Sequence, residues 1–442
     1  MTTGILALAL AAPGASRAAE PALKVSGSIR MRQEMLEGQY RPGFDNRDDI
    51  LALRSQLFVE WDSGIWRLGG EIFDSRAYDT DAGSVLSAND VDALEPVQAY
   101  VAGDFDQPFG ADSSATLQAG RFTMNVGSRR LVSSDDYRNT PQGYTGVRGD
   151  LRFSGGRRVA LFYALPVQHR PDDFASLRRN RVSLDHEGTD LQLWGVVASK
   201  VGLPGGLLAE LGYIGLKEGD HDGRATRNRD LQNLSARLIR DAAPGRWDYE
   251  LESIHQSGHI RAGTGAAAAL LDVEADFVHA DVGYTLAGAW QPHFTLEYDY
   301  ASGDGPGAKY SRFDTLFGMR RSDLAPSGIY GAIGRTNLES VGLRLEGAPT
   351  SRLDLLLTYR ILWAADRHDS FSTSGIRDAT GSSGSRAGQQ VDARLRYWLL
   401  PQRLRTELTS VILFRGDLLR EAPNASVHGD THYLAASLTL SY

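Results

Sequence analysis

The sequence contains no cysteine and no long apolar run after its N-terminal segment. Without cysteine, disulfide scaffolds, cysteine-ligated zinc sites and thiol catalysis are excluded. No later stretch reaches the ~18 consecutive apolar residues of a membrane-spanning helix. Basic residues are in the minority, because 47 Lys and Arg face 55 Asp and Glu for a net charge of −8. This balance argues against a nucleic-acid partner, since binding a phosphate backbone requires an excess of Lys and Arg.

The N-terminal segment has the pattern of an export signal. An apolar run over residues 5–12 is followed by small residues that suit cleavage near Ala18 or Ala19. No Lys or Arg precedes the apolar run, so a cytosolic N-terminus is the alternative. We expect residues 1–19 to be a signal peptide and residues 20–442 to form a single domain.

The rest of the chain alternates apolar and polar residues with a period of two. Leu23, Val25 and Ile29 are apolar, whereas Lys24 and Arg30 between them are charged. This period predicts β-strands, and about eighteen such segments can be counted, each near the ~10 residues that a tilted strand needs to cross a bilayer. Clear examples are 51–61, 247–252, 294–300, 341–346, 353–360 and 391–397.

The links between these segments alternate in length. Short links include 62–64, 154–156, 202–203, 242–244, 349–351 and 400–401. Long links include 37–49, 79–94, 167–187, 304–335, 365–387 and 416–430. A soluble sandwich also alternates along its strands, but a Greek-key topology has no reason to keep this rhythm of links. We therefore predict an all-β fold, a transmembrane antiparallel up-and-down barrel of about 18 strands with short periplasmic turns and long extracellular loops.

Aromatic residues and the last segment support a bilayer location. Residues beside the short links include Trp61, Trp66, Trp247, Tyr284, Trp290, Phe294 and Tyr397. Such a girdle is typical of a membrane interface, although aromatic packing at a sandwich end is the alternative. The alternating segment that ends at Tyr442 resembles the recognition signal of outer-membrane barrels. We expect the barrel assembly machinery and outer-membrane lipid as partners, and a monomer.

A closed ring of about eighteen strands is too wide for its own side chains to fill. A water-filled lumen is therefore expected unless loops plug it. The alternation places charged residues of both signs on the lumen face, among them Arg30, Arg32, Arg54, Arg344, Arg360, Arg394, Arg396, Glu71 and Asp299. Arginine binds carboxylates bidentately and stays charged, so these residues are candidates for lining a pore for a carboxylated sugar polymer. Structural ion-pair ladders are the alternative.

Several motifs along the chain resemble those of the alginate-export family of outer-membrane porins. They are GEIFDSRAY at 70–78, GRF at 120–122, GSRRLV at 127–132, YDYASGD at 298–304, FDTLFG at 313–318, GIYG at 328–331, and the stretch from DSF at 369–371 to RLRYW at 394–398. Each motif is loose alone, and their order makes the resemblance more specific. The resemblance covers nearly the whole chain after the signal.

The family resemblance implies an eighteen-stranded barrel with an arginine-rich constriction, through which an anionic uronate polymer leaves the cell. It implies a pore-lining role for Arg76, Arg121, Arg129 and Arg130, which lie in family-like motifs. Ion pairs that anchor loops are the alternative for these four. The link 304–335 is long enough to fold over or into the lumen as a gate.

Other functions remain open at this point. A general or solute-specific porin for the uptake of small anionic solutes is the main alternative to export. A barrel enzyme would need a converging triad or paired carboxylates, but the ten histidines are scattered and no G-x-S-x-G motif is present, so we expect no enzyme. A closed adhesin or structural barrel is the third class. We expect no cofactor and no metal, although Asp79, Asp81, Asp45, Asp48 and Asp49 offer oxygen ligands that suit Ca²⁺.

Overall fold

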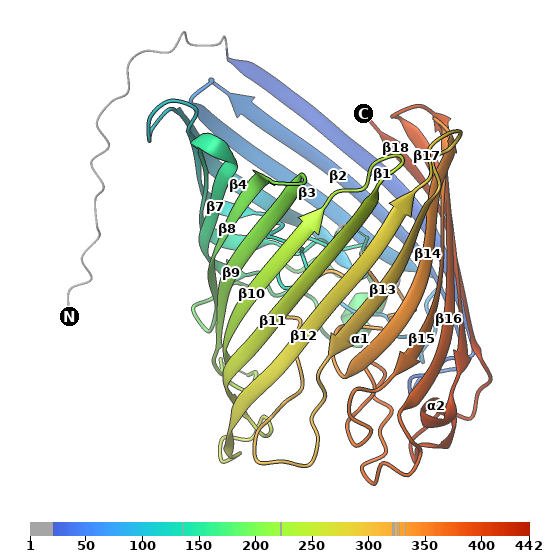
Figure 1. The fold of residues 1–442 in the computed structure, drawn as a ribbon. Helices are drawn as coiled ribbons and strands as arrows, with labels where there is room; N and C mark the ends of the chain where they lie inside the picture. Colours follow the sequence, from blue (N-terminus) through green and yellow to red (C-terminus); the bar gives the residue numbers. More distant parts are fainter. Residues whose placement is uncertain are drawn as a thin grey trace.

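The protein forms a β-barrel whose strands run steeply around an enclosed lumen (Figure 1). The structure is a computed structural model that describes residues 21–135, 137–221, 223–320, 323–324, 326, 328–331 and 333–442. The expected signal peptide lies outside the described residues. Neither α-helix in the described parts of the chain is long and apolar enough to cross a membrane.

Eighteen strands make up the sheet of the described chain. Their bounds are β1 Ala22–Glu37, β2 Arg47–Asp62, β3 Trp66–Tyr78, β4 Asp92–Asp106, β5 Ser114–Phe122, β6 Tyr144–Phe153, β7 Arg157–Pro166, β8 Leu191–Leu203, β9 Leu207–Glu218, β10 Asp230–Arg240, β11 Trp247–Arg261, β12 Leu270–Thr285, β13 His293–Ala301, β14 Leu338–Thr350, β15 Leu353–Trp363, β16 Arg386–Leu400, β17 Leu404–Arg415 and β18 Thr431–Ser441. The helical elements are η1 Ser154–Gly156, α1 Phe174–Arg178 and α2 Asp417–Glu421.

Each strand pairs antiparallel with the next, and β1 pairs with β18 to close the ring. The closing register runs from Ser28 opposite Ser441 to Glu37 opposite His432. Closure gives both edges of the sheet a partner, so the strands satisfy their backbone N–H and C=O groups internally. The predicted barrel of about 18 strands is confirmed.

The links sort to the two ends of the barrel as the sequence predicted. Tight connections, such as residues 63–65 between β2 and β3, lie at one end, which we call the turn end. The long loops, with α2 among them, lie at the opposite end, the loop end (Figure 1). The two longest loops are β7–β8 at 167–190 and β13–β14 at 302–337.

The two faces of the wall differ as the period of two requires. Leu343, Leu357 and Leu395 point outward and are exposed, with 60% of Leu343 accessible. All described strands belong to one sheet, so no second sheet among them covers these leucines. The large apolar cluster instead lies on the inner side, where loop residues such as Phe313 and Ile329 are buried. The apolar outer surface is therefore the side that lipid acyl chains cover.

Candidate pore constriction and lumen site

The β5–β6 loop, residues 123–143, folds into the lumen instead of standing above it. On one side it is held by Arg30 and Arg54, which lie opposite each other on β1 and β2 and face inward. Both guanidinium groups donate to the carbonyl oxygen of Arg138, at 2.9 Å from Arg30 and 3.0 Å from Arg54. These two predicted pore-lining arginines therefore hold a loop.

Arg32 fixes the same part of the loop. It donates to the carbonyl oxygen of Tyr137 at 2.7 Å, and its guanidinium lies 4.6 Å from the centre of the Tyr137 ring. It also pairs with Glu34 at 2.7 Å. Both side chains of this pair are buried, so Arg32 offers no free charge to a passing solute.

The other part of the β5–β6 loop reaches β11. Arg130 pairs with Glu250 and Glu252 on the inner face of β11, and with Asp323 of the β13–β14 loop at 2.8 Å. The Ser128 hydroxyl donates to Glu252 at 2.8 Å. Arg130 is 4% exposed, so this cation braces two loops against the wall.

The β13–β14 loop crosses the lumen as well and runs alongside the β5–β6 loop. The Phe317 N–H donates to the carbonyl of Leu131 at 2.9 Å, and the Ser133 N–H donates to the carbonyl of Phe317 at 3.1 Å. Further along, the Ile329 N–H donates to the Glu34 carboxylate on β1 at 2.9 Å. The expectation that this loop folds into the lumen is consistent with these contacts, which join β13–β14 to β1.

Electrostatics in the loops favour this closed arrangement. Burial disfavours a charge on Asp323, but the guanidinium groups of Arg130 and Arg335 hold the pKa of that carboxyl well below its usual range. Burial likewise opposes the charge on Arg130, yet Asp323, Glu252 and Glu250 raise the pKa of its guanidinium well above the ordinary value. Asp323 and Arg130 therefore stay charged at neutral pH, and the ion pair between the two loops persists.

Two more predicted arginines are paired on the β13–β15 wall. Arg360 donates to Glu297 at 2.7 Å and to Asp299 at 3.3 Å, and it is 1% exposed. Arg344 donates to Glu297 at 3.4 Å and to Glu346 at 2.8 Å. These inward side chains form a ladder of ion pairs, as expected if their role is structural and not solute binding.

The other residues that were predicted to face inward also have polar partners, but some of them remain partly exposed. Arg396 donates to Asp354 at 2.7 Å, and Arg394 lies 3.9 Å from the same carboxylate. Glu71 on β3 accepts a hydrogen bond from the Gln98 amide at 2.6 Å. Arg396 keeps about a third of its side chain exposed, so it remains accessible to solvent in spite of its partner.

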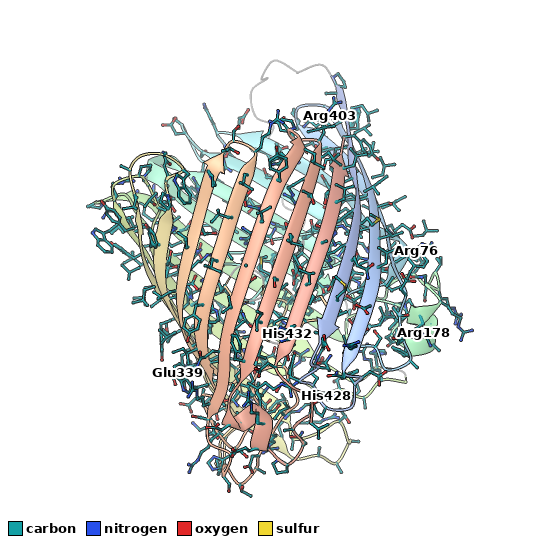
Figure 2. All side chains as sticks on the ribbon, turned by 90° about the vertical axis from the view of Figure 1, so that its right-hand side faces the viewer. Arg76, Arg178, Glu339, Arg403, His428 and His432 are labelled. Carbon is teal, nitrogen blue, oxygen red and sulfur yellow. The ribbon has the colours of Figure 1, made fainter. Side chains whose placement is uncertain are left out.

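Arg76 and Arg121 are not brought to the lumen. Arg76 lies opposite Leu53 on the outer side of β3, where it pairs with Asp74 at 2.9 Å (Figure 2). Arg121 shares the face of β5 that carries the exposed Leu117, and its guanidinium is held between the carboxylates of Glu95 and Glu187. The reason is the alternation itself: on β3 the odd positions face inward, so position 76 faces outward, and on β5 the even positions face inward, so position 121 faces outward. Their predicted pore-lining role is corrected to ion pairs at the wall.

Arg129 has a different environment from its neighbour Arg130. It lies on the loop inside the lumen, its side chain is exposed, and no ion pair of Arg129 occurs among the described residues. Its φ of 65° turns the chain between the two contacts that Ser128 and Arg130 make with β11. Of the four residues taken from the family motifs, Arg129 is the one that is exposed and has no ion pair within the described residues.

The sequence analysis missed three arginines on β6 and β7. Arg152 and Arg158 lie directly opposite each other, both are exposed, and neither pairs with an acid within the described chain. Arg148, two positions before Asp150 on β6, pairs with it at 2.7 Å. The alternation of Arg148, Asp150 and Arg152 with Val147 and Leu151 could have revealed these positions.

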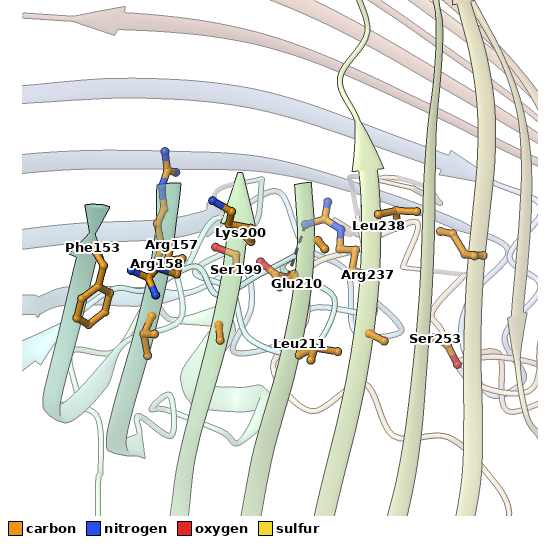
Figure 3. A pocket seen from close by; sticks show the side chains of 15 residues that line it. Phe153, Arg157, Arg158, Ser199, Lys200, Glu210, Leu211, Arg237, Leu238 and Ser253 are labelled. Atoms are coloured by element: carbon orange, nitrogen blue, oxygen red, sulfur yellow. Dashed lines mark ion pairs between the residues drawn. The ribbon is translucent and has the colours of Figure 1, made fainter. Parts of the chain in front are cut away.

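These three arginines line a cavity of about 450 Å³ between the inner face of β5–β9 and residues 125–127 of the β5–β6 loop. Figure 3 shows the turn end of this wall, where Arg158, Ser199 and Glu210 occur on successive strands and Glu210 approaches Arg237 at 3.9 Å. The same region carries an outer groove of about 800 Å³ that contains Leu211 and Leu251. The wall is therefore polar inside and apolar outside over the same residues.

Comparison with known proteins identifies the type of barrel. The sequence profile of the family described as alginate export matches residues 22–431. The chain belongs to the alginate export family. This member of the alginate export family is an outer-membrane channel for an anionic substrate. No curated protein matches the chain in sequence.

Solved structures of Pseudomonas aeruginosa proteins share the fold of this alginate export family member. OpdO is 14% identical with a TM-score of 0.60, covering 95% of this chain and 97% of its own. OpdK with vanillate is 14% identical with a TM-score of 0.58, covering 95% and 98%. OccK2 (OpdF) in complex with glucuronate is 15% identical with a TM-score of 0.56, covering 94% and 96%. At these identities the likeness concerns the fold.

Proposed function

We propose that the barrel exports a carboxylated polysaccharide, an alginate-like polyuronate, and that Arg129, Arg152 and Arg158 contact it. The observation that carries this assignment is the pair Arg152 and Arg158, which face the lumen cavity from opposite positions with no acidic partner among the described residues. Membership of the alginate export family supports the substrate class. The other inward arginines of the site are engaged by carboxylates or carbonyl oxygens.

The geometry suits binding that is selective and weak. Directly opposite residues on antiparallel strands have Cβ atoms about 4.5–5.5 Å apart, so two guanidinium groups can share one carboxylate or hold two successive ones. A guanidinium binds a carboxylate with two parallel hydrogen bonds, which favours uronates over neutral sugars. Solvent screens exposed charge pairs, which contribute at most about 1 kcal/mol each, so the polymer can leave one site for the next.

The loops inside the lumen define the route. The β5–β6 and β13–β14 loops fill the lumen beside β1 and β11, whereas the cavity of about 450 Å³ lies along β5–β9. A saccharide chain that follows the open side passes Arg152 and Arg158 on the wall and Arg129 on the loop. The OccK2 complex with glucuronate, a single uronate in a barrel of the same fold, is consistent with such a path.

The apolar outer face and the closing strand suggest the remaining partners. Leu434, Leu438 and Leu440 of β18 are exposed on the outer side, where outer-membrane lipid would cover them. We include in the proposal that the barrel assembly machinery recognises β18, and that the closed barrel works as a monomer.

A blockade experiment in planar bilayers tests the function. The purified protein should conduct, prefer anions and be blocked by oligouronates, because the carboxylates occupy Arg152 and Arg158. Neutral oligosaccharides of the same length should block far less. The double variant Arg152→Ala with Arg158→Ala should lose most of the block, whereas Arg157→Ala, at the exposed position beside Arg158, should keep it. Equal block by charged and neutral oligosaccharides contradicts the proposal.

Uptake of small carboxylates is the second candidate. It is favoured by the two loops in the lumen and by the vanillate and glucuronate present in structures of the same fold. Chain length separates the two functions. Export of a polymer predicts that block strengthens from the monouronate to longer oligouronates, because successive carboxylates engage Arg129, Arg152 and Arg158 together. Block that is as strong with glucuronate as with the oligomers supports uptake.

A further inference from the structure

Two loops at the loop end bring together histidines that are 35 positions apart in the sequence. His186 and Asp190 belong to the β7–β8 loop, and His221 belongs to the β9–β10 loop. One ligand atom from each of the three lies within 4.8 Å of the other two. We propose that His186, Asp190 and His221 bind a divalent transition-metal ion of the Zn²⁺ type, which joins the two loops.

The donor set suits Zn²⁺ better than Ca²⁺. The Nε2 atom of His186 lies 3.8 Å from Oδ1 of Asp190, and the two imidazole rings are 5.5 Å apart. The Nε2 atom of His221 is shielded from solvent and has no hydrogen-bond partner within the described residues. Two imidazoles and one carboxylate are typical of zinc, whereas Ca²⁺ takes six or more oxygen ligands. Three protein ligands leave one position for water in a tetrahedral site.

Neighbouring groups orient these ligands. The Gln168 amide donates to Oδ2 of Asp190 at 3.2 Å, which leaves Oδ1 on the side of His186. Arg224 donates to the side-chain oxygen Oε1 of Gln168 at 3.3 Å, and this contact fixes the amide so that its nitrogen faces Asp190. The backbones of Gln168 and His186 exchange two hydrogen bonds, at 2.8 and 3.1 Å. Metal sites use such supporting hydrogen bonds to set ligand orientation.

Gly188 leaves the space between the ligands open. A Cβ atom at this position would lie 2.3 Å from Oδ1 of Asp190 and 3.2 Å from Nε2 of His186. Any side chain there would push the carboxylate away from the imidazole. A glycine at 188 is therefore required for the close approach of the two ligand atoms, so replacing it tests the site without removing a ligand.

A second cluster of Asp92, His169 and Asp185 has the same number of ligand atoms but different chemistry. The Nδ1 atom of His169 is hydrogen-bonded to Asp185 at 2.8 Å and lies 3.5 Å from Asp92. Burial opposes a charge on His169, but the two aspartates raise the pKa of its imidazole to about 9. A proton therefore occupies this cluster at neutral pH. In the His186 cluster, by contrast, Nε2 of His186 lies 3.8 Å from Oδ1 of Asp190, beyond hydrogen-bond distance.

Zinc binding to the purified full-length barrel in detergent tests the proposal. Isothermal titration with ZnCl₂ should show one site, and His221→Ala should weaken it at least tenfold. Gly188→Ala should weaken it to a similar extent although it retains all three ligands. His428→Ala, which removes a half-buried histidine of the β17–β18 loop, is the matched control and should bind as the unchanged protein does.

The outcomes are distinguishable from failure to fold and from failure of the channel function. Each variant should migrate as a folded barrel on an unheated gel, because the substitutions lie in loops. Absence of zinc binding by the unchanged protein overturns the proposal, as does binding that His221→Ala and Gly188→Ala both leave intact. A loss confined to Gly188→Ala and His221→Ala supports it, whatever the substrate of the pore.

Discussion

The inner arginines of this barrel fall into two regions with different roles. Around β1, β2 and the lumen loops, Arg30, Arg32 and Arg130 are buried and held by carbonyl oxygens or carboxylates. Along β6 and β7, Arg152 and Arg158 face open space without an acidic partner in the described chain. The sequence analysis named the first three as candidates and missed the last two, although all five are arginines on the inner side. Burial and ion pairing therefore distinguish an arginine that holds a loop from one that is accessible to a solute.

The difference follows from the cost of isolating a charge. A guanidinium that is removed from water must keep strong partners, and once it has them it has no capacity left for a solute. A guanidinium in solvent has weak partners at most, which a permeating carboxylate can replace. We therefore propose that the lumen of this barrel divides into a structural half and an open half along β6 and β7 that anions can enter.

The largest effect is expected from breaking the brace. Arg130→Ala leaves the buried Glu252 and the partly buried Glu250 and Asp323 without their shared cation, which should reduce the free energy of unfolding by about 3–5 kcal/mol. Conductance should rise because the two loops lose their common anchor. Urea titration of unfolding and single-channel recording measure the two quantities. Arg129→Ala is the matched control, and an equal loss of stability in that variant would contradict the assignment.

The next effect concerns the open half. Replacing Arg152 and Arg158 by Ala should lower the anion-to-cation permeability ratio several-fold at 0.1 M salt. The difference should shrink at 1 M salt, where the Debye length falls from about 10 to about 3 Å. Reversal potentials in bilayers measure the ratio, and stability should change by less than about 0.5 kcal/mol, as for surface substitutions. An unchanged ratio at low salt would show that these arginines do not meet the ions.

A smaller effect is expected from pH at the β7–β8 loop. Burial disfavours the charged form of His169, but Asp185 and Asp92 raise its pKa to about 9, above the ~6.5 of an unfolded chain. The contact therefore stabilises the loop fully below about pH 6.5 and is lost as the pH rises through about 9. Since the chain has no cysteine, Arg178→Cys in α1 gives a single labelling position.

Fluorescence anisotropy of a label at this cysteine should fall between pH 7 and 10 as the loop loosens. The same label in a His169→Gln background should show a flat profile over that range. A midpoint below pH 7 would mean that the two aspartates do not hold the proton on His169.

The smallest effect is expected at Arg76. Its pair with Asp74 lies on the outer side of β3 and both side chains are partly exposed. Such pairs contribute about 0–1 kcal/mol, so Arg76→Ala should leave both stability and permeability ratios nearly unchanged. If Arg76→Ala lowered anion preference as much as the loss of Arg152 and Arg158, the side chain would have to reach the lumen.

The barrel itself was predictable because its determinants are local. Each strand needs only alternation with a period of two and a turn at the right end, as in 353–360 and the link 400–401. The same rule assigns the face of each strand position. It placed Arg344 and Arg360 inward, and applied to Arg76 and Arg121 it places them outward, so the motif resemblance misled where the alternation did not.

The constriction was not predictable because its contacts are distant in the sequence. Arg130 meets Asp323 across 193 positions, and Glu34 meets Ile329 across 295. No local pattern encodes such contacts, which depend on how two irregular loops fold inside a finished ring. The same applies to His186 and His221, which look scattered in the sequence and become neighbours only when two loops meet.

The seam between β1 and β18 limits how the chain can enter a membrane. One side of β1 pairs with β2, but the other side has no partner until β18 arrives, when Ser28 comes to lie opposite Ser441. A partly inserted sheet therefore has a row of unpaired N–H and C=O groups along β1. In hydrocarbon each unpaired group costs several kcal/mol, which rules out stepwise addition of hairpins to a bare open edge. Insertion of this chain must be concerted, or another polypeptide must pair with that edge until the last strand arrives.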